Sequence, residues 1–460
     1  MLMKLTLSLE TSVLVVVMIT SFLAPFMGSA INLAIPAIGA EFSGGTLFLS
    51  WIVSGYLLAS AAFLLPCGRL ADIIGRKKIL LIGIILFACF SLLSGLAWSM
   101  ESIIVFRVGQ GMATSMIFST GMAILTSVYP PHKRGHAMGI TASATYIGLS
   151  LGPVLGGFMN YYLGWRSIFF FSALAGVTAA LIAAYRLKGE WADAKDETFD
   201  WLGSACYMIA ITAVLYGLSS LSNTVWGKYS LVFGLVLLAL FIVYESKQDY
   251  PIFRVELFRH NTVFAFSNLA AMINYSATFA VGFLVSLLLQ VVMEYDSHVA
   301  GFILLAQPLM MAAFSPFAGS LSDRIQPRIV ASLGMGLSTL GLFIFTWITP
   351  ATSSWLIMIN LAFIGLGFAL FSSPNTNALM GSVEKRFYGI ASSSLATSRL
   401  TGQAVSMAIV TLLLSVYVGD VSLGQHHTDQ LIEGFRMTFL VFTVLCTAGI
   451  FASLARGKGH

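Results

Sequence analysis

Long stretches without a charged residue recur from one end of the chain to the other. They cover residues 11–40, 42–68, 79–100, 108–131, 137–165, 167–185, 201–227, 229–244, 261–293, 299–322, 329–383, 400–419 and 437–455. A helix needs about 20 mostly apolar residues to cross a bilayer. The 329–383 stretch is long enough for two helices, and the polar segment 349–354 is typical of a turn between them. The pattern predicts an all-α membrane protein with fourteen transmembrane helices.

The composition supports the same class. Of 460 residues, 58% are hydrophobic and 9% are charged, whereas a soluble domain carries roughly 25% charged residues. The first apolar stretch is much longer than the core of a signal peptide, which runs about 7–15 residues, so we expect it to be the first span. The four cysteines lie in apolar stretches without paired spacing, and the histidines lie in loops or near ends. We therefore expect no metal and no cofactor.

Most of the 24 lysines and arginines fall in alternate loops. The positive-inside rule places such loops in the cytoplasm, and both termini then lie inside. The net charge of +5 is a consequence of this topology. Nothing else in the sequence suggests a nucleic-acid partner.

Two short polar segments, Gly68–Lys78 and Gly319–Arg328, are similar to each other. Each combines glycine or serine with a carboxylate and cations, and each lies between two apolar stretches. A carboxylate near a helix N-terminus is stabilised by the helix dipole and can also pair with cations across the turn. Such a pair would hold a cytoplasmic gate shut in one state and break in the other. The predicted gating residues are Gly68, Asp72, Gly75, Arg76 and Lys77 in the first copy, and Asp323 and Arg324 in the second.

The second copy is the weaker of the two, because Gln326 replaces the second glycine and Pro327 follows it. The alternative is a basic loop with an incidental acid, and the presence of two copies argues against it.

The repeat also pairs Gly139 with Gly389. It pairs Gly152 with Gly402 in the same way.

The repeat predicts how the chain is divided. Repeated helical bundles around a central site are typical of secondary transporters, which move a solute by alternating access. We expect a six-helix bundle in residues 1–187, a cytoplasmic linker in 188–200, two added helices in 201–246, a cytoplasmic loop in 247–260 and a second six-helix bundle in 261–460.

Small residues recur at every fourth position in one predicted helix. Gly148, Gly152 and Gly156 lie on one stripe, and Gly157 adjoins it. A smooth stripe lets two helix backbones approach closely, which favours packing in membranes. Pro153 adds a bend whose freed carbonyl group needs a partner. We expect this segment to serve helix packing rather than substrate contact.

Two arginines lie inside predicted spans. Arg107 is roughly 9 Å from the outer surface at about 1.5 Å per residue, and Arg399 lies near mid-depth. A charge at the bilayer centre costs at least about 2.5–3.5 kcal/mol on insertion scales, so each arginine must face a cavity or a partner. One interpretation is a structural arginine that caps carbonyl groups or pairs with Gln110 or Gln403. The other is a cavity cation for substrate or coupling.

Further polar side chains fall on helices that we expect to line a central cavity. Taken singly, such residues are more typical of hydrogen bonds between helices than of ligand contacts. The candidate cavity residues are Asn32, Tyr56, Gln110, Tyr146, Asn274, Gln307, Asn375 and Arg399, with Tyr275 and Asn377 beside them.

Five motifs together carry a family resemblance. They are Gly68-x-x-x-Asp72-x-x-Gly75-Arg76-Lys77, Arg107-Val-Gly-Gln110-Gly111, Gly148-Leu-Ser-Leu-Gly152-Pro153-Val-Leu-Gly156-Gly157, Trp165-Arg166-Ser-Ile-Phe169 and Phe199-Asp200-Trp201-x-Gly203. The chain resembles the major facilitator superfamily, and within it the fourteen-helix drug:proton antiporters. The resemblance implies two six-helix bundles plus two extra central helices, multidrug efflux with H+ as coupling ion, and the plasma (inner) membrane of a prokaryote. Such a fold works as one chain, so we expect a monomer.

The acids depart from the pattern of that family. Its members carry an acidic residue in helix 1 before an Asn-x-Ala-x-Pro pattern, which begins here at Asn32, and Met27 takes the place of the acid. None of the 19 acids falls in the middle of a predicted helix. We therefore expect a neutral to positive cavity that favours neutral, anionic or zwitterionic amphiphiles over lipophilic cations. The candidates for a shallower proton carrier are Glu41, Glu101, Glu294 and Asp296 near the outer mouth and Asp72 near the inner one.

Three functions compete on this sequence. The first is a secondary active exporter of hydrophobic or amphipathic small molecules. The second is a carrier for a specific anionic or zwitterionic metabolite or lipid, which the missing helix-1 acid favours. The third is a membrane-embedded enzyme or receptor. Against the third, the sequence has no set of residues for a catalytic triad, no His-Glu-x-x-His motif and no phosphate-binding loop. It also has no soluble domain that could transmit a receptor signal.

Overall fold

The computed structural model describes residues 8–42, 46–221, 225–295, 297–417 and 428–456, and within these ranges the chain is helical without any strand. The helices are α1 (Leu9–Phe42), α2 (Thr46–Ile74), α3 (Arg76–Gly95), α4 (Met100–Val128), α5 (Pro131–Leu163), α6 (Arg166–Arg186), α7 (Trp201–Ser219), α8 (Val225–Glu245), α9 (Val255–His260), α10 (Thr262–Thr278), α11 (Val281–Leu287), α12 (Ser297–Leu304), α13 (Ala306–Ser322), α14 (Pro327–Phe345), α15 (Ser354–Gly381), α16 (Tyr388–Tyr417) and α17 (Thr428–Leu454). Fourteen helical segments are long and apolar enough to cross a membrane. The prediction of an all-α protein with fourteen such helices is confirmed.

Several helices continue beyond the uncharged stretches that predicted them. Helix α2 runs on to Ile74 and carries Arg69 and Asp72, both fully buried. Helix α16 begins at Tyr388, well before the uncharged stretch that starts at residue 400. A charged side chain does not end a helix when the tertiary structure supplies its partner, so charge alone misplaced these ends.

The ninth span is interrupted, which the continuous apolar stretch 261–293 does not predict. Helix α10 ends at Thr278 and α11 starts at Val281, followed by a π-helical turn over Leu288–Val292. The backbone N–H of Ala280 donates to the hydroxyl of Ser406 on α16 at 3.1 Å. A polar side chain from a neighbouring helix thus accepts a hydrogen bond from a backbone N–H group at the break. Such a group needs a partner because the bilayer core holds no water.

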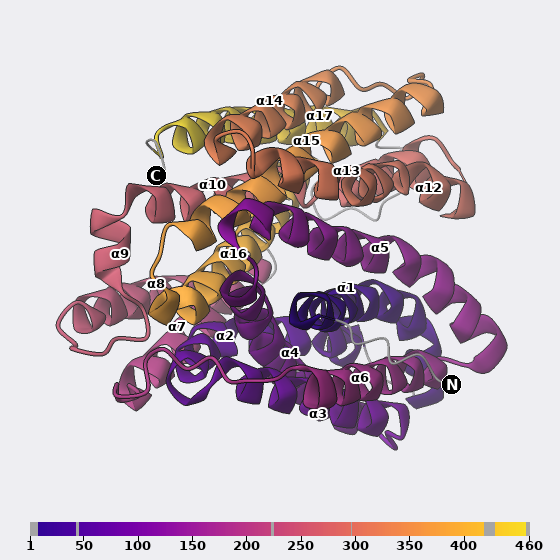
Figure 1. The fold of residues 1–460 in the computed structure, drawn as a ribbon. Coiled ribbons are helices and arrows are strands. Elements are labelled where there is room, and N and C mark those ends of the chain that lie inside the picture. Colours follow the sequence, from indigo (N-terminus) through magenta and orange to yellow (C-terminus); the bar gives the residue numbers. More distant parts are fainter. Residues whose placement is uncertain (1–7, 43–45, 222–224, 296, 418–427, 457–460) are drawn as a thin grey trace, which may run out of the picture.

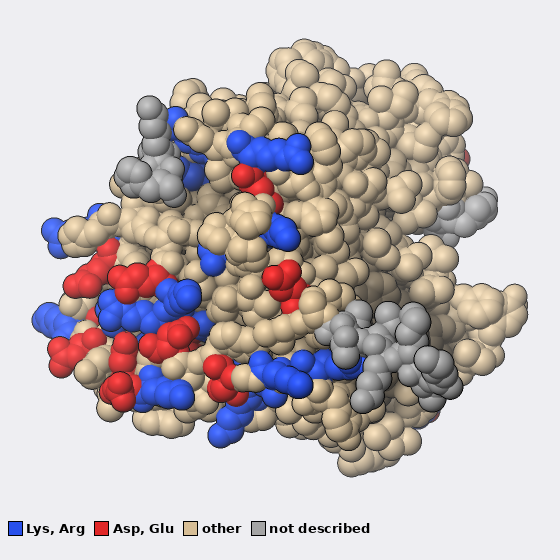
Figure 2. Space-filling model, viewed as in Figure 1, with Lys and Arg blue, Asp and Glu red and all other residues tan. Residues whose placement is uncertain are grey.

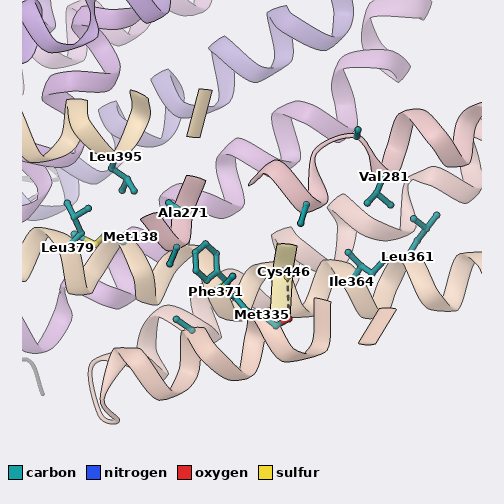
Figure 3. Packing of buried hydrophobic residues seen from close by; sticks show 14 of the residues in the cluster. Met138, Ala271, Val281, Met335, Leu361, Ile364, Phe371, Leu379, Leu395 and Cys446 are labelled. Atoms are coloured by element: carbon teal, nitrogen blue, oxygen red, sulfur yellow. Dashed lines mark hydrogen bonds between the residues drawn. The ribbon is translucent and has the colours of Figure 1, made fainter. Parts of the chain in front are cut away.

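The helices form two groups that contact each other along two main seams. Helices α1–α6 occupy the lower part of Figure 1 and α10–α17 the upper part. Helix α5 packs against α13, and α2 packs against α16. The largest buried hydrophobic cluster crosses between the groups, since it joins Met138 of α5 to Leu379 and Leu395 of α15 and α16 (Figure 3).

The two added helices pack on each other, and α7 also packs on the seam between α2 and α16. Helix α8 exposes most of its large apolar side chains, which suits a surface that faces lipid. Tyr207 of α7 is buried, and its hydroxyl contacts both groups. It lies 3.3 Å from the Ala61 carbonyl oxygen of α2 and 3.1 Å from the Thr397 hydroxyl of α16.

Charged side chains gather at one end of the molecule, on the left in Figure 2. This charged end carries α9, the segment 188–200 and the turns that follow α2 and α13. The opposite end shows few charges in this view. The same asymmetry follows from the distribution of charges in the sequence.

The glycine stripe of α5 lies directly against α1. A Cβ atom on Gly148 would lie 2.4 Å from the Phe22 carbonyl oxygen, and one on Gly156 would lie 2.6 Å from the Ala30 Cβ. At Gly152 it would overlap the Ser29 hydroxyl at 1.8 Å. Gly157 is half-buried beside this stripe and Pro153 is exposed, and α5 continues through both as one helix.

The contacts correct the predicted register of the repeat by one helical turn. A Cβ on Gly135 would lie 2.3 Å from the Gly319 carbonyl oxygen, and one on Gly389 would lie 2.3 Å from that of Gly68. Gly389 therefore corresponds to Gly135 and not to Gly139. By the same reasoning Gly402, which abuts the carbonyl oxygen of Met272 on α10 at 2.5 Å, corresponds to Gly148 and not to Gly152. Gly139 also approaches α13 closely, at 2.3 Å from the Ser315 carbonyl oxygen, so the identity of the contacted residue and not closeness alone fixes the register.

We predict that Gly152→Val lowers the thermal stability of the purified protein, because overpacking a close contact costs about 1–3 kcal/mol. The matched control is Gly28→Ala on α1, where a Cβ would meet nothing within 4 Å. The control should unfold at the wild-type temperature or slightly above it. Thermal unfolding in detergent, followed by tryptophan fluorescence, measures both. Equal melting temperatures for Gly152→Val and wild type would contradict the prediction.

Candidate functional site

The carboxyl group of Asp72 is buried where α2 meets α16. It accepts the backbone N–H groups of Gly389 at 3.0 Å and Ile390 at 3.2 Å, in the first turn of α16. The N–H groups in a first helical turn have no partner within their own helix, and the dipole adds partial positive charge there. We call the contact of Asp72 with α16 the first latch. The sequence placed this carboxylate near a helix end but did not show that the helix belongs to the other half.

Arg76 completes the first latch on the side of α3. Its guanidinium contacts the Asp72 carboxylate at 2.7 Å and the Asp193 carboxylate at 2.9 Å. It also donates to the Lys385 carbonyl oxygen and lies over the Tyr388 ring. This fully buried arginine therefore holds α2, the segment 188–200 and the start of α16 together.

The two glycines of this turn have different roles: Gly68 allows close helix contact, and Gly75 adopts a backbone conformation with positive φ. A Cβ on Gly68 would lie 2.7 Å from the Gly389 carbonyl oxygen, so a larger residue would separate α2 from α16. Gly75 has a φ of 121° and lies against Glu190, which excludes a side chain on both grounds. Lys77 contributes its backbone N–H, which donates to the Glu190 carboxylate at 2.8 Å.

Asp323 repeats the arrangement from the other half. Its two carboxylate oxygens accept the backbone N–H groups of Gly135 at 2.8 Å and His136 at 3.0 Å, the fifth and sixth residues of α5. Asn377 donates to the same carboxylate at 3.3 Å. We call this contact the second latch. Arg324 is exposed and forms no ion pair within the described part of the chain, so no buried cation supports this latch as Arg76 supports the first.

The segment 188–200 is folded against the first latch and is not a loose linker. The Ala194 N–H donates to the Asp72 carbonyl oxygen at 3.1 Å, and the Arg76 N–H donates to that of Trp191 at 2.9 Å. Glu197 pairs with the buried Arg69 of α2. The expectation of a simple connecting linker is therefore incomplete, because its acids neutralise the cations of the gate.

Glu197 also reaches the loop 247–260. Its carboxylate lies 3.5 Å from the Arg254 guanidinium, which in turn stacks over Phe387. Burial lowers the pKa of Arg254, and the nearby Glu197 carboxylate opposes that change. One acid of the segment thus joins α2 to the loop that precedes the second half.

Arg107 lies inside the first half, where its Nε and Nη1 have hydrogen-bond partners and its buried Nη2 has none within the described chain. It donates to the Ile52 carbonyl oxygen at 3.0 Å and to the Gln110 side chain, and its guanidinium lies 4.2 Å from the Tyr56 ring centre. Gln110 donates in turn to the Ser91 hydroxyl at 2.7 Å. All these groups belong to α2, α3 and α4. The geometry favours the structural interpretation of Arg107, with Tyr56 and Gln110 as its partners.

Arg399 has a different environment, in the middle part of α16. It donates to the Thr376 hydroxyl at 2.7 Å and lies over the Tyr275 ring at 5.7 Å. Its Nε has no hydrogen-bond partner, and none of the acids in the described ranges pairs with it. Phe368 packs edge-on against both Tyr275 and Tyr146, at 5.1 and 6.0 Å between ring centres. We call Arg399, Thr376, Tyr275, Phe368 and Tyr146 the central cluster.

The remaining candidate cavity residues do not join the central cluster through hydrogen bonds within the described chain. Asn274 is fully buried, and neither its amide nitrogen nor its oxygen has a partner. Asn375 donates to the Ser267 carbonyl oxygen at 3.2 Å, which is a contact between helices. Gln307 is half-buried near Gly365, and Asn32 is exposed.

The outer acids have local roles. The Glu41 carboxylate lies 2.7 Å from Arg166 and accepts from the Trp165 indole at 2.8 Å, and these contacts lower its pKa. Glu101 is exposed in the first turn of α4, beside the side-chain cap formed by Ser99. Glu294 is also exposed. Asp296 lies outside the described residues.

Sequence reasoning missed Phe368 and Thr376, because apolar and hydroxyl side chains are common on every span. It also missed the acids of the segment 188–200 as gate partners. A signal for those acids was available, since a segment rich in Asp and Glu faces loops rich in Lys and Arg on the same side. Pairing of the two would have been a reasonable expectation.

Comparisons with known proteins agree with this architecture. A family described as the Major Facilitator Superfamily matches residues 17–288 and 267–458. The chain is 26% identical to "Riboflavin transporter RibZ" of Clostridioides difficile over 95% of both chains, and 28% identical to "Cephamycin export protein CmcT" of Amycolatopsis lactamdurans over 95% of this chain and 92% of that one. It is 28% identical to "Multidrug resistance protein Stp" of Mycobacterium tuberculosis over 84% and 73% of the two chains.

A solved structure, that of the human organic anion transporter MFSD10 (TETRAN), shares the fold. It matches with a TM-score of 0.67 at 14% identity and covers 95% of this chain and 99% of its own. The sequence match extends over nearly the whole protein, and it agrees with the fourteen apolar helices and the paired halves described above. The chain is an integral membrane protein that belongs to the Major Facilitator Superfamily of transporters.

Proposed function

We propose that this transporter is a secondary active exporter of hydrophobic or amphipathic small molecules that works by alternating access. The observation that carries the proposal is the pair of latches, in which each half caps the N-terminus of a helix of the other half. Contacts of this kind close one end of the molecule and must break for that end to open. Relatives named as multidrug resistance and cephamycin export proteins support export as the direction.

The charged end corresponds in this proposal to the cytoplasm, since the lysines and arginines gather there. Both termini are then cytoplasmic, the membrane is the inner membrane of a prokaryote, and a single chain suffices. In this proposal the described conformation is the one with its cytoplasmic gate closed. The segment 188–200 belongs to this gate, because Asp193 and Glu197 pair with Arg76 and Arg69.

The central cluster is the proposed substrate contact. A cation without an acidic partner attracts an anionic group, and the aromatic rings of Tyr146, Tyr275 and Phe368 can pack against an apolar body. This chemistry suits an anionic or zwitterionic amphiphile better than a lipophilic cation. It also favours the second candidate, a carrier for one specific anionic or zwitterionic metabolite or lipid, and a relative is named as a riboflavin transporter.

Flux into proteoliposomes under an imposed pH gradient, an imposed Na+ gradient or neither tests the transport proposal and its coupling ion. We expect substrate uptake into proteoliposomes, through protein inserted inside out, to depend on the pH gradient. Uptake driven only by Na+ would overturn proton coupling. Absence of flux under all three conditions, over a panel of amphiphiles, would overturn the export proposal.

We predict that Asp72→Asn opens the cytoplasmic gate more than Asp323→Asn does. Both lose hydrogen bonds to a charged acceptor, each worth about 1.5–3 kcal/mol, but only Asp72 also loses a buried ion pair. Spin labels at exposed Lys78 and Arg324, on opposite halves, report the separation of the charged ends. The population with a long distance should rise about tenfold or more in Asp72→Asn.

The control for this experiment is Glu384→Gln at the same end. Its carboxylate pairs only with the exposed Arg386 among the described residues, and exposed pairs contribute little. The control should keep the wild-type distance distribution. An equal response of all three variants would contradict a specific role for the latches.

We predict that Arg399→Gln lowers transport of an anionic amphiphile about tenfold or more, since a hydrogen bond to a charged group is worth about 1.5–3 kcal/mol. Arg399→Lys keeps the charge and should retain part of the activity. Transport of a neutral analogue should change little in either variant. A wild-type protein that prefers a cationic dye, or an Arg399→Gln variant with equal losses for both analogues, would contradict the proposed role.

A further inference from the structure

The inner ends of α7 and α8 hold two carboxyl groups that neither latch uses. Asp200 caps α7, and its Oδ1 accepts the Gly203 N–H at 2.8 Å. Glu245, the last residue of α8, is 1% exposed, and its Oε2 accepts the Phe253 N–H at 2.9 Å. The second oxygen of each group, Asp200 Oδ2 and Glu245 Oε1, is buried and has no hydrogen-bond partner.

These two unpartnered oxygens face each other across Gly203. A Cβ atom on Gly203 would lie 2.4 Å from Asp200 Oδ2 and 2.2 Å from Glu245 Oε1. The distance between the two oxygens is therefore at most the sum of these two distances. Only a residue without a side chain leaves this space open.

No cation balances the pair. Within the described chain neither carboxyl group forms an ion pair, and the nearest loop arginine, Arg254, pairs with Glu197 instead. The other titratable groups here are Tyr244, whose hydroxyl donates to Asp200 Oδ1 at 3.4 Å, and Cys206, which faces Tyr244. Glu245 is buried and Asp200 is half-buried, so two negative charges in this space would repel each other.

We propose that Asp200 and Glu245 form a proton-binding site, in which one proton is held between Asp200 Oδ2 and Glu245 Oε1. A metal ion is the less suitable occupant, because the other two oxygens already accept N–H groups. Within the described residues no group of three or more His, Cys, Asp or Glu side chains is placed to hold a metal. A shared proton satisfies both remaining oxygens and leaves one negative charge, which the N-terminus of α7 stabilises.

The proton links three parts of the chain. It joins the start of α7 to the end of α8, and through Glu245 it holds Phe253 of the loop 247–260. Phe253 packs on Phe241 of α8 and on Phe258 of α9. Loss of the proton would place two negative charges in contact, so we expect this junction to loosen as the pH rises. The site is independent of the proposed substrate and direction of transport.

Infrared difference spectroscopy of the full-length protein in nanodiscs, over about pH 5 to 9, tests the site without any transport measurement. Wild type should show a protonated-carboxyl band at neutral pH that disappears as the pH rises. Glu245→Gln and Asp200→Asn should each lose this band, because an amide can donate to the remaining carboxylate. Asp200→Asn also keeps the helix cap, since asparagine serves in that position.

The matched control is Asp249→Asn, an exposed acid in the adjacent loop, which should keep the band. Thermal unfolding gives a second readout. A site that binds its proton more tightly in the folded state stabilises the protein at low pH, and this contribution is lost as the pH rises. Glu245→Gln should remove that dependence. A band that persists in both variants, or one that Na+ abolishes at constant pH, would overturn the proposal.

Discussion

The closed end of this transporter depends on carboxylates of each half that accept backbone N–H groups near the start of a helix of the opposite half. Backbone N–H groups must find acceptors where water is excluded. The buried Asp72 accepts them from α16, and the half-buried Asp323 accepts them from α5. Close approach through Gly68 and Gly389, and through Gly319 and Gly135, makes both contacts possible. The glycines and the carboxylates therefore act together.

The two latches are alike in geometry and unequal in support. Asp72 is fully buried and pairs with the buried Arg76, whose other partners lie on the segment 188–200 and at the start of α16. Asp323 has an amide as its side-chain partner. The Asp72–Arg76 pair lies within the first half, so it stays intact when α2 separates from α16. Opening the first latch therefore breaks the hydrogen bonds from Gly389 and Ile390 to Asp72 and the one from Arg76 to Lys385.

The arginines within the membrane show why burial alone does not identify a functional charge. Both Arg107 and Arg399 are costly in an apolar helix, and each has a buried nitrogen without a hydrogen-bond partner among the described residues, but Arg107 donates through its two other nitrogens to groups on α2 and α4. Arg399 has one hydroxyl partner, one aromatic neighbour and an unpartnered Nε. The difference lies in the neighbours, and those neighbours come from helices far apart in the sequence.

The membrane class, the fourteen helices, the family and the residues of the two turns could be predicted from the sequence, because the length of an apolar stretch and the placement of charges are local properties that insertion into a bilayer depends on. The contacts of Asp72 with Gly389, of Glu197 with Arg69 and of Asp200 with Glu245 could not be predicted, because they depend on how the helices pack. Tertiary structure also decided the register of the repeat, where Gly135 and Gly148 took the places predicted for Gly139 and Gly152. A polar group in a chain can satisfy several partners of the same chemical type. Only the packing of helices against one another selects which partner comes within hydrogen-bonding distance.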